Sequence, residues 1–329
     1  MGRESLKDQR EKLRSLIADY LGMVVVLIGL IAVFSLSAEN FLTLTTFRTS
    51  ANQIPAAIII AVGMTFVLII AEIDLSVGSV LALSAAVLGV ILVQFKLPLP
   101  LAVLACLVVG LGCGLLNGFV TVRWALPSFI VTLGMMEVAR GGAYLVTNSQ
   151  TKYIGSVVER IAETSLFGLS FPFLLAIVIV FCGQLILSCT RFGRHVVAIG
   201  ANEEAARLSG INTKSLKLAV FSLSGLLCAV AAIINTSRMG AADPNAGSGF
   251  ELQAIAACVI GGTSLMGGRG SIISTFFGVI IIAVLGAGLT HVGAQEPTKR
   301  LITGLVIVAA VILDHYRHRL KKQGRSICS

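Results

Sequence analysis

Residues 54–93 read IPAAIIIAVGMTFVLIIAEIDLSVGSVLALSAAVLGVILV, and this stretch decides the fold class. It belongs to two apolar runs, near 52–71 and 78–95, and its only charged residues are Glu72 and Asp74 between them. A helix needs about 20 mainly apolar residues to cross a bilayer. The stretch therefore predicts two membrane spans joined by a short polar turn.

The composition of the whole chain agrees with this prediction. Of the 329 residues, 56% are hydrophobic and only 12% are charged, whereas a soluble domain has about 25% charged residues. A water-soluble chain this poor in charge would lack the polar residues to cover its surface, so an all-α polytopic membrane protein is predicted. The net charge of +9 is assigned to tails and loops on the cytoplasmic side, and no nucleic-acid partner is expected.

The length criterion predicts about ten transmembrane helices. They are placed near 21–38, 52–71, 78–95, 100–120, 127–147, 171–189, 217–236, 250–264, 271–290 and 301–314. The third begins at a glycine-containing loop and the eighth is short and ends in glycine, so each is a candidate for a broken or re-entrant segment.

The distribution of Lys and Arg predicts both termini in the cytoplasm. Residues 1–20 are then a cytoplasmic tail, 21–314 a transmembrane domain and 315–329 a second cytoplasmic tail. A Gly-Ser pair precedes an apolar helix at 78–79 and again at 270–271. This similarity indicates two weakly related halves of opposite orientation, an arrangement common in transporters.

The longest inside loop, at 190–217, reads TRFGRHVVAIGANEEAARLSGINTKSLK. Asn202 is a good N-cap for a short helix that begins at Glu203. The Glu203 carboxylate complements the positive end of the helix dipole, and Arg207 complements the negative end. Gly210 is suited to end the helix in the left-handed conformation.

Two interpretations of this short helix are open. It is either an ordinary capped loop or a docking element for a partner, and the docking role is favoured because short loops seldom contain an autonomous helix. On the docking interpretation, Ala205 and Ala206 form a small-residue face that enters a groove on the partner.

Polar residues next to the spans are the remaining candidates for function. Asp74 and Ser76 either form part of a gate in the translocation path or, as favoured, cap the next helix at the cytoplasmic interface. Asn117 is expected to bond across helices or to line the pore. Glu251 either complements the dipole of its helix or binds substrate hydroxyls at the outer mouth.

No catalytic constellation is found in the sequence. It contains no G-x-x-x-x-G-K-[ST] phosphate-binding loop and no H-E-x-x-H, and its seven cysteines are scattered. We therefore expect no catalytic residue, no metal and no cofactor in this chain. Any ATP-driven step would take place on another subunit.

Four stretches in order resemble one transporter family. The stretch 193–212 in the long loop resembles the coupling loop of ABC importer permeases of the ribose, xylose and galactose type. AEIDLSVGSVLALSA (71–85), LLNGFVTVRWALPSFIVTLGMM (115–136) and GSGFELQAIAACVIGGTSLMGGRGS (247–271) resemble three further signatures of that family.

The resemblance implies a monosaccharide importer permease in the bacterial inner membrane, surrounded by lipid. It implies pairing with a second permease copy or a paralogue, cytoplasmic subunits that bind ATP and Mg²⁺, and a periplasmic sugar-binding protein. The short helix at 203–209 would then insert into the ATPase. The residues expected to matter for this coupling are Gly200, Asn202, Glu203, Ala206, Arg207 and Gly210.

Two alternatives remain. Permeases for branched-chain amino acids are distantly similar, including a D-L-S-x-G run. An ion-coupled secondary carrier is less favoured, because such carriers bury several ionisable residues in their spans and the predicted span centres here are almost free of charge.

Overall fold

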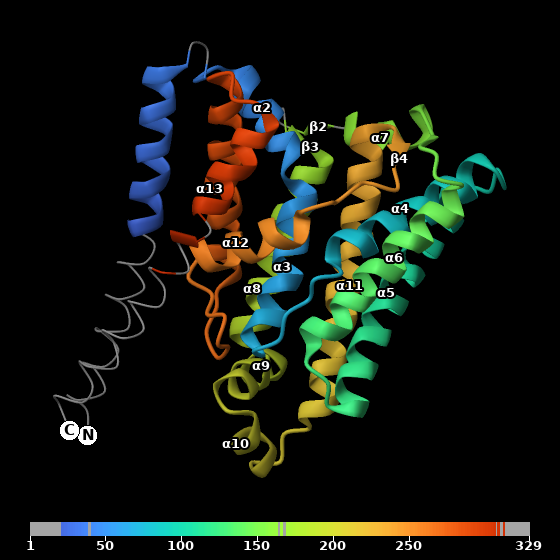
Figure 1. Cartoon of the computed structure of the whole chain (residues 1–329), viewed down its shortest axis with the longest axis vertical. Helices are drawn as coiled ribbons and strands as arrows, with labels where there is room; N and C mark the ends of the chain where they lie inside the picture. Colours follow the sequence, from blue (N-terminus) through green and yellow to red (C-terminus); the bar gives the residue numbers. More distant parts are fainter. Residues whose placement is uncertain are drawn as a thin grey trace.

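The computed structural model describes residues 21–38, 41–163, 165–166, 169–306, 308–309 and 312, and most of these are helical (Figure 1). The two predicted cytoplasmic tails, at 1–20 and 315–329, and the placement of the termini lie outside the described residues.

The chain forms a series of helices with very short strands between some of them. The helices are Leu21–Ser37, α2 (Leu44–Gln53), α3 (Pro55–Ile69), α4 (Val77–Val93), α5 (Leu99–Trp124), α6 (Ser128–Thr147), α7 (Ser156–Glu163), α8 (Phe171–Cys189), α9 (Arg191–Ala201), α10 (Glu203–Leu208), α11 (Thr213–Met239), α12 (Phe250–Ile260) and α13 (Ile272–His291). Residues 296–306 are also helical. Two antiparallel pairs of strands join β1 (Lys152–Tyr153) to β4 (Ala241–Ala242) and β2 (Ser165–Leu166) to β3 (Leu169–Ser170).

Five helices of the described residues are long and apolar enough to cross a membrane, namely α5, α6, α8, α11 and α13. A sixth span results if α2 and α3, which are bent by 46° at their junction, count as one. The helix Leu21–Ser37, α4 and α12 are shorter apolar helices. The prediction of a multi-pass helical membrane protein is confirmed in this form, and the count of ten spans stays a prediction.

Helix α3 is the centre of the molecule. Nearly all of its side chains are buried, and it packs against α8, α11, α12 and α13. Because it is apolar on every side, it has no amphipathic pattern, as expected for a helix surrounded by other helices.

Helices α5 and α11 approach each other so closely that their backbones touch. A Cβ atom on Gly110 would lie 2.5 Å from the carbonyl oxygen of Gly225, and one on Gly114 would overlap the carbonyl oxygen of Phe221. Spacing of small residues by four is how transmembrane helices reach such contact. Gly110 and Gly114 of α5 therefore allow the two backbones to touch.

Candidate coupling and translocation sites

Helix α10 has the capped geometry that its sequence predicts. The side chain of Asn202 accepts a hydrogen bond of 3.0 Å from the backbone N–H of Ala205, which satisfies one of the free donors of the first turn. Gly210, two residues after the last helical residue, has φ of +84°, in the left-handed region. Both ends of this six-residue helix are therefore set by local sequence.

A second helix in the same loop, α9, was not predicted. Its buried residues, Gly193, Val196 and Ile199, recur every three positions and face the core. Thr190 caps it by accepting a hydrogen bond from the N–H of Gly193. This spacing is the signal that the sequence contains for α9, and it is easily overlooked in a loop that also contains five Lys and Arg residues.

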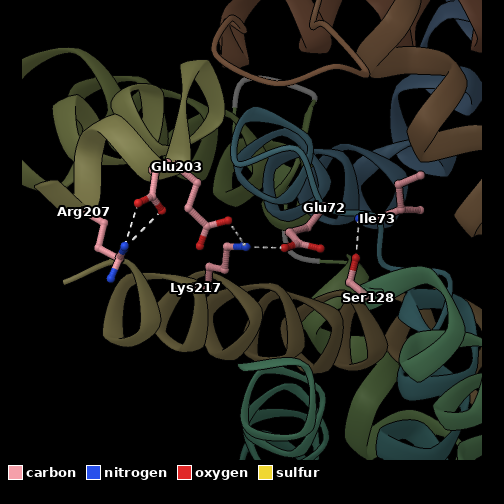
Figure 2. A network of polar contacts seen from close by, with 7 residues as sticks. Glu72, Ile73, Ser128, Glu203, Arg207 and Lys217 are labelled. Atoms are coloured by element: carbon pink, nitrogen blue, oxygen red, sulfur yellow. Dashed lines mark hydrogen bonds and ion pairs between the residues drawn. The ribbon is translucent and has the colours of Figure 1, made fainter. Parts of the chain in front are cut away.

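An ion-pair network joins α10 to the helices that cross the molecule (Figure 2). The ammonium group of Lys217, in α11, lies 2.8 Å from a carboxylate oxygen of Glu203 and 2.6 Å from one of Glu72. The side chains of Lys217 and Glu72 are only 14% and 13% exposed. One buried cation thus ties the start of α10 to the segment between α3 and α4.

Sequence reasoning included Glu203 in the coupling set but not Lys217 or Glu72. Lys217 was counted only as one of the inside-loop cations, and no local pattern indicated its partners. The hydrogen bond between Lys217 and Glu72 joins residues 145 positions apart.

The outward surface of α10 differs from the predicted small-residue face. Ala205 is exposed, but Ala206 is buried at 5% exposure and packs into the core. The expectation that both alanines face a partner is therefore wrong for Ala206. Consecutive side chains of a helix point about 100° apart around its axis, so Ala206 points toward the protein when Ala205 points outward. The exposed apolar residue is instead Leu208, at 77% exposure.

Beside Leu208, Arg207 and Glu204 form an exposed ion pair with an N–O distance of 2.6 Å. The hydrogen bond from Arg207 and its positive charge lower the pKa of the Glu204 carboxyl. The outward surface of α10 thus presents an exposed apolar side chain beside an ion pair.

Gly200 lies in a tight junction and not on the exposed surface of α10. A Cβ atom there would overlap the carbonyl oxygen of Ile69, at the end of α3, and would lie 2.5 Å from the backbone nitrogen of Gly268. The N–H of Gly268 donates a 2.8 Å hydrogen bond to that same carbonyl of Ile69. Glycine at position 200 is therefore required by contact between backbones.

The glycine-rich turn that follows α12 completes this junction. Gly267 and Gly268 have φ of +80° and +74°, and a Cβ atom on Gly267 would lie 2.7 Å from the Cβ of Ala71. Glycine at these positions permits a sharp turn and a close approach of the backbones. The ends of α3 and α9 and the α12–α13 turn thus meet at one point.

The segment 70–76 returns toward the middle of the molecule before α4 begins (Figure 1). Helix α6 satisfies its backbone donors: the N–H of Ile73 donates to the hydroxyl of Ser128 at 3.0 Å, and that of Leu75 donates to Thr132 at 3.0 Å. Buried backbone donors need such partners, so the segment has a defined conformation.

Asp74, at the centre of this segment, is 2% exposed. One carboxylate oxygen accepts hydrogen bonds from the N–H and the hydroxyl of Ser76, at 3.0 and 2.6 Å, and the other accepts from Ser224 of α11 at 3.0 Å. Asn117 of α5 donates to the Ser76 hydroxyl at 2.9 Å. The structure therefore brings together three of the four residues predicted for the path.

This arrangement corrects the favoured interpretation of Asp74. The carboxylate does hold the N-cap residue of α4 through the N–H of Ser76, but the Ser76 side chain makes no capping bond of its own. Asp74 is buried among three helices instead of lying at an exposed interface. The carbonyl oxygen of the Asn117 side chain, also buried, has no hydrogen-bond partner among the described residues.

The fourth residue, Glu251, lies in the first turn of α12, at the start of α4. Its carboxylate accepts a 3.2 Å hydrogen bond from the N–H of Gly249, as expected for an acidic residue at a helix start. A Cβ atom on Gly78 would lie 2.6 Å from the other carboxylate oxygen and would overlap the carbonyl oxygen of Gly247. The amino-terminal ends of two short helices thus meet at Gly78.

These features define the class as a multi-pass helical membrane protein. The starts of the short helices α4 and α12 meet inside it, and the capped helix α10 is ion-paired to α11. Residues 46–311 match the family described as the permease component of the branched-chain amino acid transport system. The chain belongs to this family of transport permeases.

Curated relatives cover most of the chain. The ribose import permease protein RbsC of Escherichia coli (strain K12) is 38% identical over 298 residues, which is 89% of this chain and 92% of the relative. The fructose import permease protein FrcC of Rhizobium meliloti is 33% identical, over 89% and 84% of the two chains. The xylose transport system permease protein XylH of Escherichia coli (strain K12) is 34% identical, over 92% and 93%.

Proposed function

We propose that this chain is the membrane subunit of an ABC importer for a monosaccharide in the bacterial inner membrane. The observation that supports it most is the full-length similarity to ribose, fructose and xylose permeases. The family description names branched-chain amino acids, but these three relatives are named for sugars, so the amino-acid alternative is not favoured. The proposed assembly has ten spans per chain, two inverted halves and both termini in the cytoplasm.

The proposed partners are those that the similarity to importer permeases implies, and the sequence itself contains no G-x-x-x-x-G-K-[ST] motif. A second copy or a paralogue completes the pore, a periplasmic protein delivers the sugar, and separate subunits hold ATP and Mg²⁺. The exposed surface of α10, with Leu208 and the pair of Arg207 and Glu204, is the part that contacts the ATPase.

The ion pairs of Lys217 provide a route from α10 into the spans. A shift of α10 moves Glu203, and Lys217 passes the displacement to Glu72 and the segment 70–76. The junction of Gly200 with Ile69 and Gly268 ties the same movement to α3 and the α12–α13 turn. The Gly200 junction is formed by backbone atoms that cannot yield, whereas the Lys217 ion pairs, with Glu203 48% exposed, form a more flexible link.

The proposed translocation path runs past the starts of α4 and α12. Helix starts are partially positive, and broken helices of this kind line substrate sites in many transporters. The hydroxyl and amide groups of Ser76 and Asn117 suit a neutral sugar, which is recognised by hydrogen bonds and not by ion pairs. Movement of the segment 70–76 would open or close this region.

Uptake by the reconstituted importer tests the substrate class. The chain is placed in liposomes with its ATPase and its periplasmic binding protein, and ATP-dependent uptake of labelled ribose, xylose, fructose and leucine is measured. We expect uptake of a monosaccharide and none of leucine. Leucine uptake without sugar uptake would show that the amino-acid alternative is right.

The variant Leu208→Asp tests the coupling surface. Because Leu208 is exposed, the substitution should leave folding of the chain unchanged and weaken its binding to the ATPase, with a loss of sugar uptake. Added bulk at Ala206, by contrast, would overpack the core and is less informative. Full uptake by Leu208→Asp would exclude α10 as the contact.

A further inference from the structure

A recess lies between the end of α5 and the start of α11, next to α10. Its volume is about 360 Å³. Two cations and three apolar side chains surround it, together with one hydroxyl: Arg123, Lys214, Phe119, Val122, Leu218 and Ser215.

The charges around the recess are unbalanced within the described part of the chain. Arg123 is in the last turn of α5 and Lys214 in the first turn of α11, and neither takes part in the ion pairs of the described residues. The start of α11 adds the positive end of its dipole, which disfavours a cation there. Two cations and a helix start that converge without an acidic partner favour an anionic ligand.

The apolar side of the recess continues along an exposed surface of α5. Leu115, Leu116 and Phe119 are 40%, 55% and 52% exposed. Trp124, the only tryptophan of the chain, is exposed at the end of α5 and meets Phe119 edge to face at 5.9 Å. Tryptophan is enriched where a span meets the head groups, so the cations lie at head-group level with an apolar surface beside them.

We propose that this recess binds the phosphate of an anionic phospholipid from the leaflet on the α10 side of the membrane. Arg123 and Lys214 hold the phosphate, and an acyl chain lies along Leu115, Leu116 and Phe119. Basic pockets between transmembrane helices suit acidic head groups. A soluble phosphate would use the cations but would leave the apolar walls without a partner.

Lipid retention by the purified full chain tests the proposal. Native mass spectrometry in neutral detergent compares phosphatidylglycerol with phosphatidylcholine of the same acyl chains. The wild type should retain several-fold more phosphatidylglycerol, and the double variant Arg123→Gln/Lys214→Gln should retain the two equally. The matched control, Arg48→Gln/Lys96→Gln, removes one Arg and one Lys that are exposed in α2 and after α4, and it should behave as the wild type.

Two further measurements separate the other outcomes. Arg123→Lys/Lys214→Arg keeps both charges and should keep the phosphatidylglycerol, and the glutamine variant should have the thermal midpoint of the wild type, which shows that its effect is a loss of charge and not of folding. Inorganic phosphate at millimolar concentration should not displace the lipid. Equal phosphatidylglycerol retention by the glutamine variant and the wild type, or displacement of the lipid by inorganic phosphate, would overturn the proposal.

Discussion

Helix α11 is held by two contacts of opposite character. Against α5 it touches backbone to backbone, through Gly110, Gly114 and Gly225, with no charge involved. Near its start, Lys217 holds two glutamates through a flexible side chain. The first contact permits one geometry because backbones cannot yield, whereas the second can exchange partners by rotation of side chains.

The glycine contact is therefore expected to act as a rigid scaffold, and the Lys217 network as a part that can move. The α5–α11 contact preserves the distance between two spans, and the Lys217 network sits where α10 would deliver movement. If these two roles are right, substitutions in the glycine contact should destroy the folded protein. Substitutions that break the ion pairs should change coupling more than folding.

The largest effect is expected from Gly114→Ala. The added methyl group would overlap the carbonyl oxygen of Phe221, and forcing extra volume into a packed contact costs up to about 3 kcal/mol. The thermal midpoint and the yield of monodisperse protein in detergent should both fall. Gly112→Ala, on the same helix with nothing within 4 Å, is the control, and equal losses in both variants would contradict the scaffold role.

Lys217→Met should have the next largest effect on stability, at about 2 kcal/mol. This is less than the loss for a fully buried pair, since Lys217 retains 14% exposure, but two glutamates lose their shared cation. Sugar uptake should also fall, and the amount of ATP hydrolysed per sugar imported should rise.

Lys299→Met is the control for that experiment. It breaks a pair with Glu296, which is 73% exposed, and such exposed pairs contribute little to stability. If Lys217→Met loses stability but keeps the ratio of hydrolysis to import, the network is structural only.

Ser224→Ala examines a contact between α11 and the segment 70–76. It removes one donor to the buried carboxylate of Asp74, and a hydrogen bond to a charged group contributes about 1.5 kcal/mol. Ser222→Ala, whose hydroxyl bonds only to the backbone of its own helix, should cost less than about 0.5 kcal/mol. Equal thermal midpoints for the two variants would argue that the Asp74 cluster adds nothing to the fold.

The smallest effect on stability is expected from Arg207→Ala. Its pair with Glu204 is exposed on both sides, at 62% and 65%, so solvent screens the pair and the thermal midpoint should hardly change. Binding of the ATPase to the purified chain should nevertheless weaken. Unchanged binding would show that Arg207 is not part of the coupling surface.

Local patterns in the sequence were sufficient to predict the apolar segments and α10, but not α9. Apolar runs placed α8 at 171–189 and indicated that the third and eighth segments are irregular, which agrees with the short helices α4 and α12. Asn202 and Gly210 marked the ends of α10. Such features depend on neighbours within one or two turns, and capping and periodicity report those directly.

The tertiary structure alone decided which residues meet. It joined Lys217 to Glu72, grouped Asp74 with Ser76, Asn117 and Ser224, and turned Ala206 inward. A span that is apolar on all sides gives no signal of which face meets which neighbour. The sequence therefore determined a helical membrane protein with a capped helix in its longest loop, but helix packing decided how that helix is connected to the spans, because the contacts join residues far apart in the chain.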